Sequence, residues 1–252
     1  MVGRPEAEIA LDEAMLLVAA QSRVDIDLPG ALATLDELAA ACPGPTLDHL
    51  VRHLFVDRGY AGNRDDYYDP RNSYLDEVLV RRLGIPISLA VLTMVVGRRL
   101  GVATDGVAMP GHFLVRDRVD RGVFVDPFSA GAMLDVAGCA ALFRRLHGPD
   151  VAFDERFLEP VGPRVILQRV LANLTAIHRT SGDRGALVGV LRLAVTLPGA
   201  ADEQRRELAA ALAATGQFAT AAEQLEAVAA GGSGDRSAAD LAAATRFRAR
   251  LN

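Results

Sequence analysis

The chain has 252 residues, of which 50% are hydrophobic and 23% are charged, and its formal net charge is -5. This length accommodates one large domain or two modest ones, with a buried core. The acidic balance argues against nucleic-acid binding, which needs a basic face that displaces counterions. The longest apolar run, residues 85–96, is too short to span a bilayer, so we expect no membrane insertion.

The two cysteines, Cys42 and Cys139, lie far apart and lack the CxxC spacing of metal and redox sites. No secretory signal is recognisable at the start of the sequence. We therefore expect a cytoplasmic protein without disulfides, in which each cysteine is a small buried hydrophobe.

Helices are expected over 9–20, 31–41 and 46–56, the last of them capped by Thr46. Residues 59–73 are rich in Gly, Asn and Asp and are expected to form an ordered loop. A capping-box-like segment, 73–76, then opens another helix, for which Gly84 is the expected C-terminal stop.

The segment from Pro86 to Leu100 is apolar on nearly all sides and stops at Gly101. Pro86 suits the first turn of a helix, because its missing N–H group has no partner to lose there. A helix that is apolar all round is buried, so we expect this one at the centre of the domain.

Three short strands are predicted next, over 106–109, 112–116 and 123–126. Antiparallel pairing about the charged turn at 117–122 brings His112 opposite Asp126 or next to it, within a residue of register. Side chains at paired positions share a face, so the imidazole and the carboxylate should come within hydrogen-bonding distance.

After a short helix at 137–146, the remaining chain is predicted to be helical, which divides it into domains 1–160 and 161–252. Gly182 recurs as Gly216, and three apolar positions after each glycine recur at the same offset of 34. That offset is the tetratricopeptide period. An unrelated alanine-rich helical bundle remains the alternative. The paired apolar positions are Leu187 with Ala221, Leu191 with Leu225, and Ala194 with Val228.

Four motifs together resemble the SirB-type transglutaminase-like family, over about residues 5 to 230. They are 68–75 (YDPRNSYL), 82–89 (RLGIPISL), 110–116 (PGHFLVR) and 126–131 (DPFSAG). The resemblance implies an α+β fold, in which a papain-related core packs a small antiparallel sheet against a central helix. It also implies an all-α tetratricopeptide-like region after that core.

Active relatives with this fold carry a cysteine near the start of the central helix, followed by a His and an Asp on strands. Matching the motifs puts Pro86 at the cysteine position and His112 and Asp126 at the other two. Members of this family generally lack the cysteine. Proline supplies neither a nucleophile nor a backbone N–H group for an oxyanion hole, so ordinary acyl transfer is excluded at this position.

Ser88 is the one substitute nucleophile in this motif, but it lies about half a helical turn past Pro86 and should point elsewhere. It is more simply explained as a bond to a backbone carbonyl. His112 and Asp126 also have a structural alternative, in which one hydrogen bond between them fixes the hairpin register. Both interpretations of the pair stay open.

Tyr68, Asn72 and Arg116 are candidate binding residues, and Arg116 lies along the same strand face as His112. Arg116 could reach a carboxylate ligand, or it could be solvated. Tyr68 and Asn72, with Tyr67 and Asp69, could line a pocket. Alternatively they belong to a loop held over the core by its own Asx turns.

His49 and His53 are spaced i, i+4 and could face a metal ion, but no third ligand is evident in the sequence. A solvated helix face is the simpler interpretation. We therefore expect neither a metal nor a cofactor.

These features predict a cytoplasmic, bacterial-type protein that has lost acyl-transfer catalysis. It would act as an adaptor or regulator that binds another protein or a peptide segment. The alternative is a hydrolase or transferase that uses His112 and Asp126 as a base pair on water or substrate, without a covalent intermediate. The oligomeric state is left open.

Overall fold

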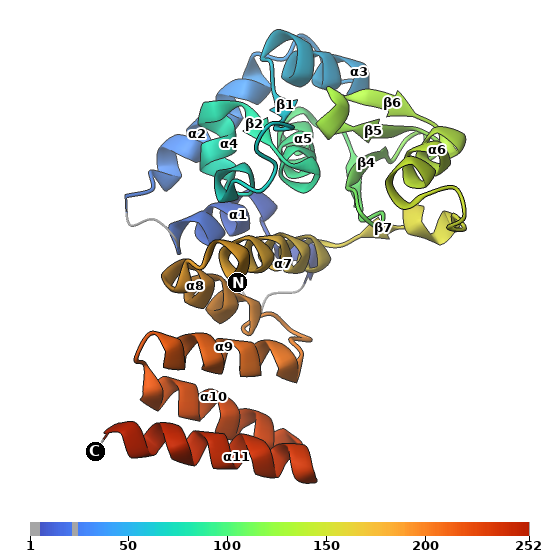
Figure 1. Ribbon diagram of the computed structural model, residues 1–252. Helices are drawn as coiled ribbons and strands as arrows, with labels where there is room; N and C mark the ends of the chain where they lie inside the picture. Colours follow the sequence, from blue (N-terminus) through green and yellow to red (C-terminus); the bar gives the residue numbers. More distant parts are fainter. Residues whose placement is uncertain (1–5, 22–24, 252) are drawn as a thin grey trace. The chain divides into compact units, whose positions relative to one another are not determined.

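The computed structural model describes residues 6–21 and 25–251, and Figure 1 shows the course of the chain. Two compact units divide between Val170 and Leu171, inside helix α7 (Pro163–Ser181). The predicted boundary lies earlier, at residue 160. Across the described residues, no helix is both long and apolar enough to cross a membrane.

The first helices form close to where the sequence predicts them. They are α1 (Leu11–Ala20), α2 (Leu28–Ala40), α3 (Leu47–Val51) and a π-helical turn, η2 (Arg52–Asp57). Thr46 caps α3 as predicted, with its side chain accepting a hydrogen bond from the His49 N–H. Helix α2 begins three residues before the predicted start, because Asp27 caps it and Pro29 fits its first turn.

Helix α5 (Pro86–Leu100) is the centre of the first unit, as its all-round apolarity predicts. It contacts helices α1 to α4 and strands β1 to β4, and Figure 1 shows it between the N-terminal helices and the sheet. Pro86 occupies its first turn, and Gly101 ends it in the left-handed conformation, with φ of 78°.

The predicted start and end of the preceding helix are wrong. Helix α4 (Leu75–Arg81) starts after Tyr74 with no side-chain cap, and Arg82, not Gly84, ends it with φ of 58°. Gly84 instead belongs to strand β2 (Leu83–Gly84), which pairs in parallel with β1 (Ala61–Gly62). A Cβ atom at Gly84 would lie 2.8 Å from Ser88 Oγ, so this glycine permits a close approach.

A five-stranded antiparallel sheet, ordered β6-β5-β4-β3-β7, lies between α5 and α6 (Val136–His147) (Figure 1). Leu114 and Phe124 pack with α6, and the alternate residues Val115 and Val125 are fully buried on the other face. The strands are β3 (Thr104–Val107), β4 (Leu114–Asp117), β5 (Phe124–Asp126), β6 (Ala132–Leu134) and β7 (Pro160–Val161).

The predicted register, with His112 opposite Asp126 or within one residue of it, is wrong. Val115 pairs with Val125, and the same register continued puts Asp126 opposite Leu114, two residues from His112. His112 lies before β4, because a tight turn at 109–112 takes it out of the ladder. It therefore approaches Asp126 diagonally, as neighbours separated by two residues do on one face.

The second unit is helical and has its own core. Gly182 and Gly216, the glycines at an offset of 34, both lie between consecutive helices and have φ of 74° and 79°. Leu191 and its counterpart Leu225 are both buried in this core. The assignment as tetratricopeptide-type repeats stays a prediction. The helices after α7 are α8 (Arg184–Ala194), α9 (Asp202–Ala214), α10 (Phe218–Gly231) and α11 (Asp235–Arg248).

The left-handed ends of α4 and α5, at Arg82 and Gly101, provide a matched test of this backbone geometry. Arg82→Gly should raise the free energy of unfolding by about 0.5–1 kcal/mol, because a left-handed L-residue costs roughly 1–2 kcal/mol. Gly101→Ala should lower it by about 1 kcal/mol, since nothing lies within 4 Å of a Cβ atom there and only backbone strain is added. Urea denaturation measures both, and changes of equal sign would contradict the assignment.

Candidate functional site

His112 and Asp126 form a buried hydrogen-bonded pair, with 2.8 Å between His112 Nε2 and Asp126 Oδ1. His112 is 7% exposed and Asp126 is 2% exposed. Because Asp126 engages Nε2, the neutral imidazole carries its proton there, and Nδ1 is the atom that can take a proton from a ligand or from water. The pair has the geometry of a general base with its orienting carboxylate.

Three hydrogen bonds to its Oδ1 hold the Asp126 carboxylate in place. Asp126 ends β5 and caps the short helix η4 (Pro127–Ser129), so its Oδ1 also accepts from the N–H groups of Phe128 and Ser129. Burial raises the pKa of the Asp126 carboxyl, but the hydrogen bond and charge of His112 and the Ser129 bonds outweigh it. The pKa therefore lies below its ordinary value of 3.8, and Asp126 is an anion.

The turn at 109–112 sets the position of His112. Its N–H donates to the carbonyl of Met109 at 3.0 Å, and Pro110 and Gly111 occupy the two central positions. Gly111 has φ of 72°, as a type II turn requires at its third residue. The carbonyl of Pro110 accepts a hydrogen bond of 2.9 Å from His147 Nε2 on α6. The turn is therefore tied to the helix that covers the sheet.

Arg169 on α7 holds the same turn, and sequence reasoning missed it. Its guanidinium donates to the carbonyls of Met109 at 2.8 Å and His112 at 3.0 Å, and it lies over the ring of Phe113. Burial lowers the pKa of Arg169, although the proximity of Tyr67 opposes that effect. The one signal in the sequence is an arginine inside an apolar run of a helix.

The start of α5 offers no nucleophile. Pro86 is buried at the first helical position, and Ser88 is fully buried two residues later. The Ser88 hydroxyl donates to the carbonyl of Asn72 at 2.5 Å and accepts from the Ile85 N–H at 3.0 Å. Its proton is therefore used inside the protein, as expected for a structural serine.

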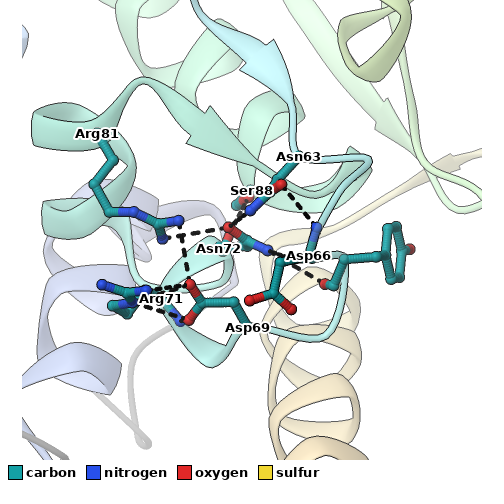
Figure 2. Close-up of polar contacts among 8 residues, drawn as sticks. Asn63, Asp66, Asp69, Arg71, Asn72, Arg81 and Ser88 are labelled. Atoms are coloured by element: carbon teal, nitrogen blue, oxygen red, sulfur yellow. Dashed lines mark hydrogen bonds and ion pairs between the residues drawn. The ribbon is translucent and has the colours of Figure 1, made fainter.

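The side-chain amide of Asn72 is the centre of a buried network, which Figure 2 shows. Its oxygen accepts from Asn63 Nδ2 at 3.0 Å and from Arg81 Nη1 at 3.3 Å. Its nitrogen donates to the carbonyls of Asp66 at 2.7 Å and Tyr67 at 3.3 Å. All the hydrogen-bonding capacity of this amide thus goes into the loop 63–72 and helix α4.

Asp69 adds a second anchor to the same loop (Figure 2). Its carboxylate forms ion pairs with Arg71 at 2.8 Å and Arg81 at 3.2 Å. Burial raises the pKa of Asp69, but the Arg71 hydrogen bonds and the charge of Arg81 bring it below its ordinary value. Asn72 and Asp69 therefore favour the interpretation of a loop held by its own polar side chains. Asn72 is not available to a ligand.

An aromatic series connects this loop with the buried pair. Tyr68 packs edge-on against Tyr67, Tyr67 against Phe128, and Phe128 against the His112 ring, with centroid distances of 5.3, 5.8 and 6.2 Å. Tyr68 is 75% exposed and so remains a candidate binding residue. Arg116 is engaged within the protein, because its Nε donates to the Arg121 carbonyl in the β4–β5 turn and its guanidinium lies over the Phe124 ring.

The remaining candidates are occupied elsewhere. His49 Nδ1 is hydrogen-bonded to Thr46 Oγ1 at 2.9 Å. The prediction of a solvated helix face is wrong for His53, which is 3% exposed and whose Nε2 accepts a hydrogen bond of 3.4 Å from Arg58 Nε. Among the residues that the structure describes, no three His, Cys, Asp or Glu side chains are grouped to hold a metal ion. Burial raises the pKa of the Cys139 thiol, and the negative charges of Asp135 and Asp126 add to this effect. The pKa rises to about 12, so the thiol stays protonated.

Comparison with known proteins shows the family to which this chain belongs. The family model described as the transglutaminase-like superfamily matches residues 11–172, which include Pro86, His112 and Asp126. A UPF0162 protein of Pseudomonas aeruginosa is 35% identical over 210 residues, covering 78% of this chain and 76% of the relative. The chain therefore belongs to the transglutaminase-like superfamily and, within it, to the UPF0162 proteins.

Two further relatives cover less of their own length. A UPF0162 protein of Xylella fastidiosa is 49% identical over 141 residues, which are 54% of this chain and 50% of the relative. The human F-box only protein 21 is 34% identical over 146 residues, which are 54% of this chain and 22% of the relative. The chain thus spans about half the length of the Xylella relative. No solved structure matches it.

The depressed pKa of Asp126 predicts how its contribution to stability depends on pH. A carboxyl whose pKa is lower when folded stabilises the protein fully above its unfolded pKa, near 3.9, and this contribution is lost as pH falls through the folded pKa. Asp126→Asn should therefore cost most near neutral pH, and the difference from wild type should shrink below about pH 4. Urea denaturation across this range tests it; a difference that stays constant would contradict the pairing.

The bonds of Ser88 predict a structural role that can be measured. Ser88→Ala leaves the Ile85 N–H and the Asn72 carbonyl without this partner, so the free energy of unfolding should fall by about 1–3 kcal/mol. Thr93→Val is the matched control on the same helix, because the Thr93 hydroxyl donates only to the Leu89 carbonyl. An equal fall in the free energy of unfolding in the two variants would contradict the larger structural role of Ser88.

Proposed function

We propose that this protein is a non-catalytic member of the transglutaminase-like superfamily that works by binding another protein or a peptide segment, as an adaptor or regulator. The observation that carries the proposal is the start of α5, where Pro86 is the first helical residue and the Ser88 hydroxyl is bonded to Asn72. The family resemblance matches Pro86 to the nucleophile of active relatives. A base without a nucleophile does not form an acyl-enzyme.

The two cysteines support the same proposal. Cys139 belongs to α6 and lies in the apolar cluster that this helix forms with the sheet, and its raised pKa leaves almost no thiolate at neutral pH. Cys42 is half-buried, not buried as predicted, and its thiol contacts the Gly44 carbonyl at 3.5 Å directly after α2.

A tetratricopeptide-like second unit would supply a further binding surface. Its helices α8 to α11 share one apolar core, and the two glycine turns 34 residues apart occupy corresponding places. Repeats of paired helices form extended surfaces that suit peptide segments and partner helices.

The alternative is a hydrolase or transferase in which His112 acts as a base on water, without a covalent intermediate. The intact pair with Asp126 favours it, because a hydrogen-bonded carboxylate orients the imidazole and stabilises its cation. This alternative requires turnover that disappears in His112→Ala.

Partner capture tests the proposal. Wild-type protein and His112→Gln, each immobilised as bait, are incubated with a lysate, and the bound proteins are identified by mass spectrometry. We expect the same partners on both baits, since binding does not depend on proton transfer. A partner or a small acyl adduct present with wild type alone would contradict a purely binding role and favour the alternative.

The position of Pro86 can be tested by restoring a thiol there. In Pro86→Cys, the helix N-terminus and His112 should lower the pKa of the introduced thiol below 7, so that iodoacetamide alkylates it about 10-fold faster at pH 7 than in Pro86→Cys/His112→Ala. The double variant controls for accessibility, and wild type measures labelling of Cys42. Equal rates in the two variants would show that Pro86 does not face the histidine.

A further inference from the structure

The loop 63–72 is anchored by buried residues near its two ends, and its middle is exposed. Asn63, Asp69 and Asn72 are buried and hydrogen-bonded, whereas the five consecutive residues 64–68 between them are all exposed. We call residues 64–68 the display loop. Ordering exposed side chains is normally part of the cost of binding, so a loop that is ordered beforehand binds a partner with less loss of entropy.

Aromatic rings dominate one end of the display loop. Tyr68 is 75% exposed and Tyr67 37%, and the two rings meet edge-to-face at 5.3 Å. Tyr67 is supported in turn by Phe128 beneath it. Tyrosine rings offer a large contact area with few rotatable bonds, which suits them to binding surfaces. They also present π faces to which cations are attracted.

The charges of the display loop favour a cation. It carries Arg64, Asp65 and Asp66, one positive and two negative charges, for a net charge of -1. The guanidinium of Arg64 is drawn over the Phe128 ring, 4.9 Å from its centroid, and donates to Ser129 Oγ at 3.5 Å. Arg64 thus shows that a guanidinium can stack on this aromatic cluster, and its own charge is directed toward η4.

Two other arginines lie near the display loop, and their positive charges could repel a basic ligand. Arg71 is paired with Asp69, and Arg169 is bonded to the carbonyls of the 109–112 turn. Both are therefore engaged within the protein. Asp65 and Asp66 are the two acidic residues of the display loop, and they directly precede the two tyrosines in the sequence.

From this arrangement we infer that the display loop is a recognition surface for a basic side chain, arginine or lysine, on an exposed segment of a partner protein. The cation stacks on Tyr68 and Tyr67, and the Asp65 and Asp66 carboxylates attract it. This inference rests on the proposed binding function and names the surface and the partner chemistry.

Immobilised short peptides that differ only in a central residue test this specificity. Wild-type protein should be retained by peptides with central arginine or lysine, and at least about 5-fold less by those with citrulline or glutamate, which lack the positive charge. Added salt should weaken retention, since the carboxylates are exposed. Equal retention by arginine and citrulline peptides, or no retention by either basic peptide, would overturn the inference.

Variants of Tyr68 separate recognition from folding. Tyr68→Ala should weaken retention by basic peptides about 5- to 30-fold, whereas Tyr68→Phe should keep it, because the π face remains. Unfolding curves should coincide, since this side chain is mostly exposed. Val119→Ala, at an exposed position in the β4–β5 turn, is the matched control and should bind as wild type does.

The same variant distinguishes this inference from the proposed function. A Tyr68→Ala bait that still captures the wild-type partners from a lysate would leave the adaptor role standing and overturn the display loop as its surface. Loss of those partners in Tyr68→Ala, together with weaker peptide retention, is the expected result. A wild-type bait that captures nothing would instead contradict the adaptor role itself.

Discussion

The buried amide of Asn72 is the constraint on which the candidate site depends. Its side chain and carbonyl join the loop 63–72, helix α4 and the start of α5 through bonds to Asn63, Arg81 and Ser88 (Figure 2). A buried polar network is stable only when all its polar groups are hydrogen-bonded, and both the oxygen and the nitrogen of the Asn72 amide are. The backbone carbonyl of Asn72 accepts the hydrogen bond of the Ser88 hydroxyl, and its side-chain amide orders the loop that exposes Tyr68. One residue therefore occupies the hydroxyl of a potential nucleophile and holds the loop that we propose as a binding surface.

His112 and Asp126 are held in place as firmly as a catalytic base and its carboxylate would be. Asp126 is held by His112 and by the N–H groups of η4, and Arg169 and His147 fix the turn that carries His112. Such fixed geometry is the condition for proton transfer, but it is equally a way to hold the hairpin and the aromatic series beside it. Because Pro86 supplies no nucleophile, the second role accounts for the pair without a reaction.

Some of this architecture follows from local sequence. The apolarity of 86–100 predicts a central helix, Pro86 predicts its first turn, and the charged segment 117–122 predicts a hairpin that brings His112 close to Asp126. These features depend on neighbouring residues, whose preferences the sequence displays directly.

Other features depend on contacts between distant residues, and the sequence does not display them. Gly84 resembles a helix stop, but the absence of a side chain there allows Ser88 to lie close. The residue that ends α4 in the left-handed conformation is Arg82. The register near His112 depends on how the 109–112 turn is held by Arg169, some 60 residues later. The bonds of Asn72 likewise come from α4 and α5. Periodicity cannot reveal such partners, because they arise only when the elements pack.

The most direct measurement is intact-protein mass spectrometry after incubation with an activated phenyl ester, on wild type and His112→Ala in parallel. Since no nucleophile lies at the start of α5, the account predicts no acyl adduct that depends on His112, and the two proteins should show the same distribution of masses. A stoichiometric adduct on wild type that is absent from His112→Ala would contradict it, because the site would then hold a working nucleophile.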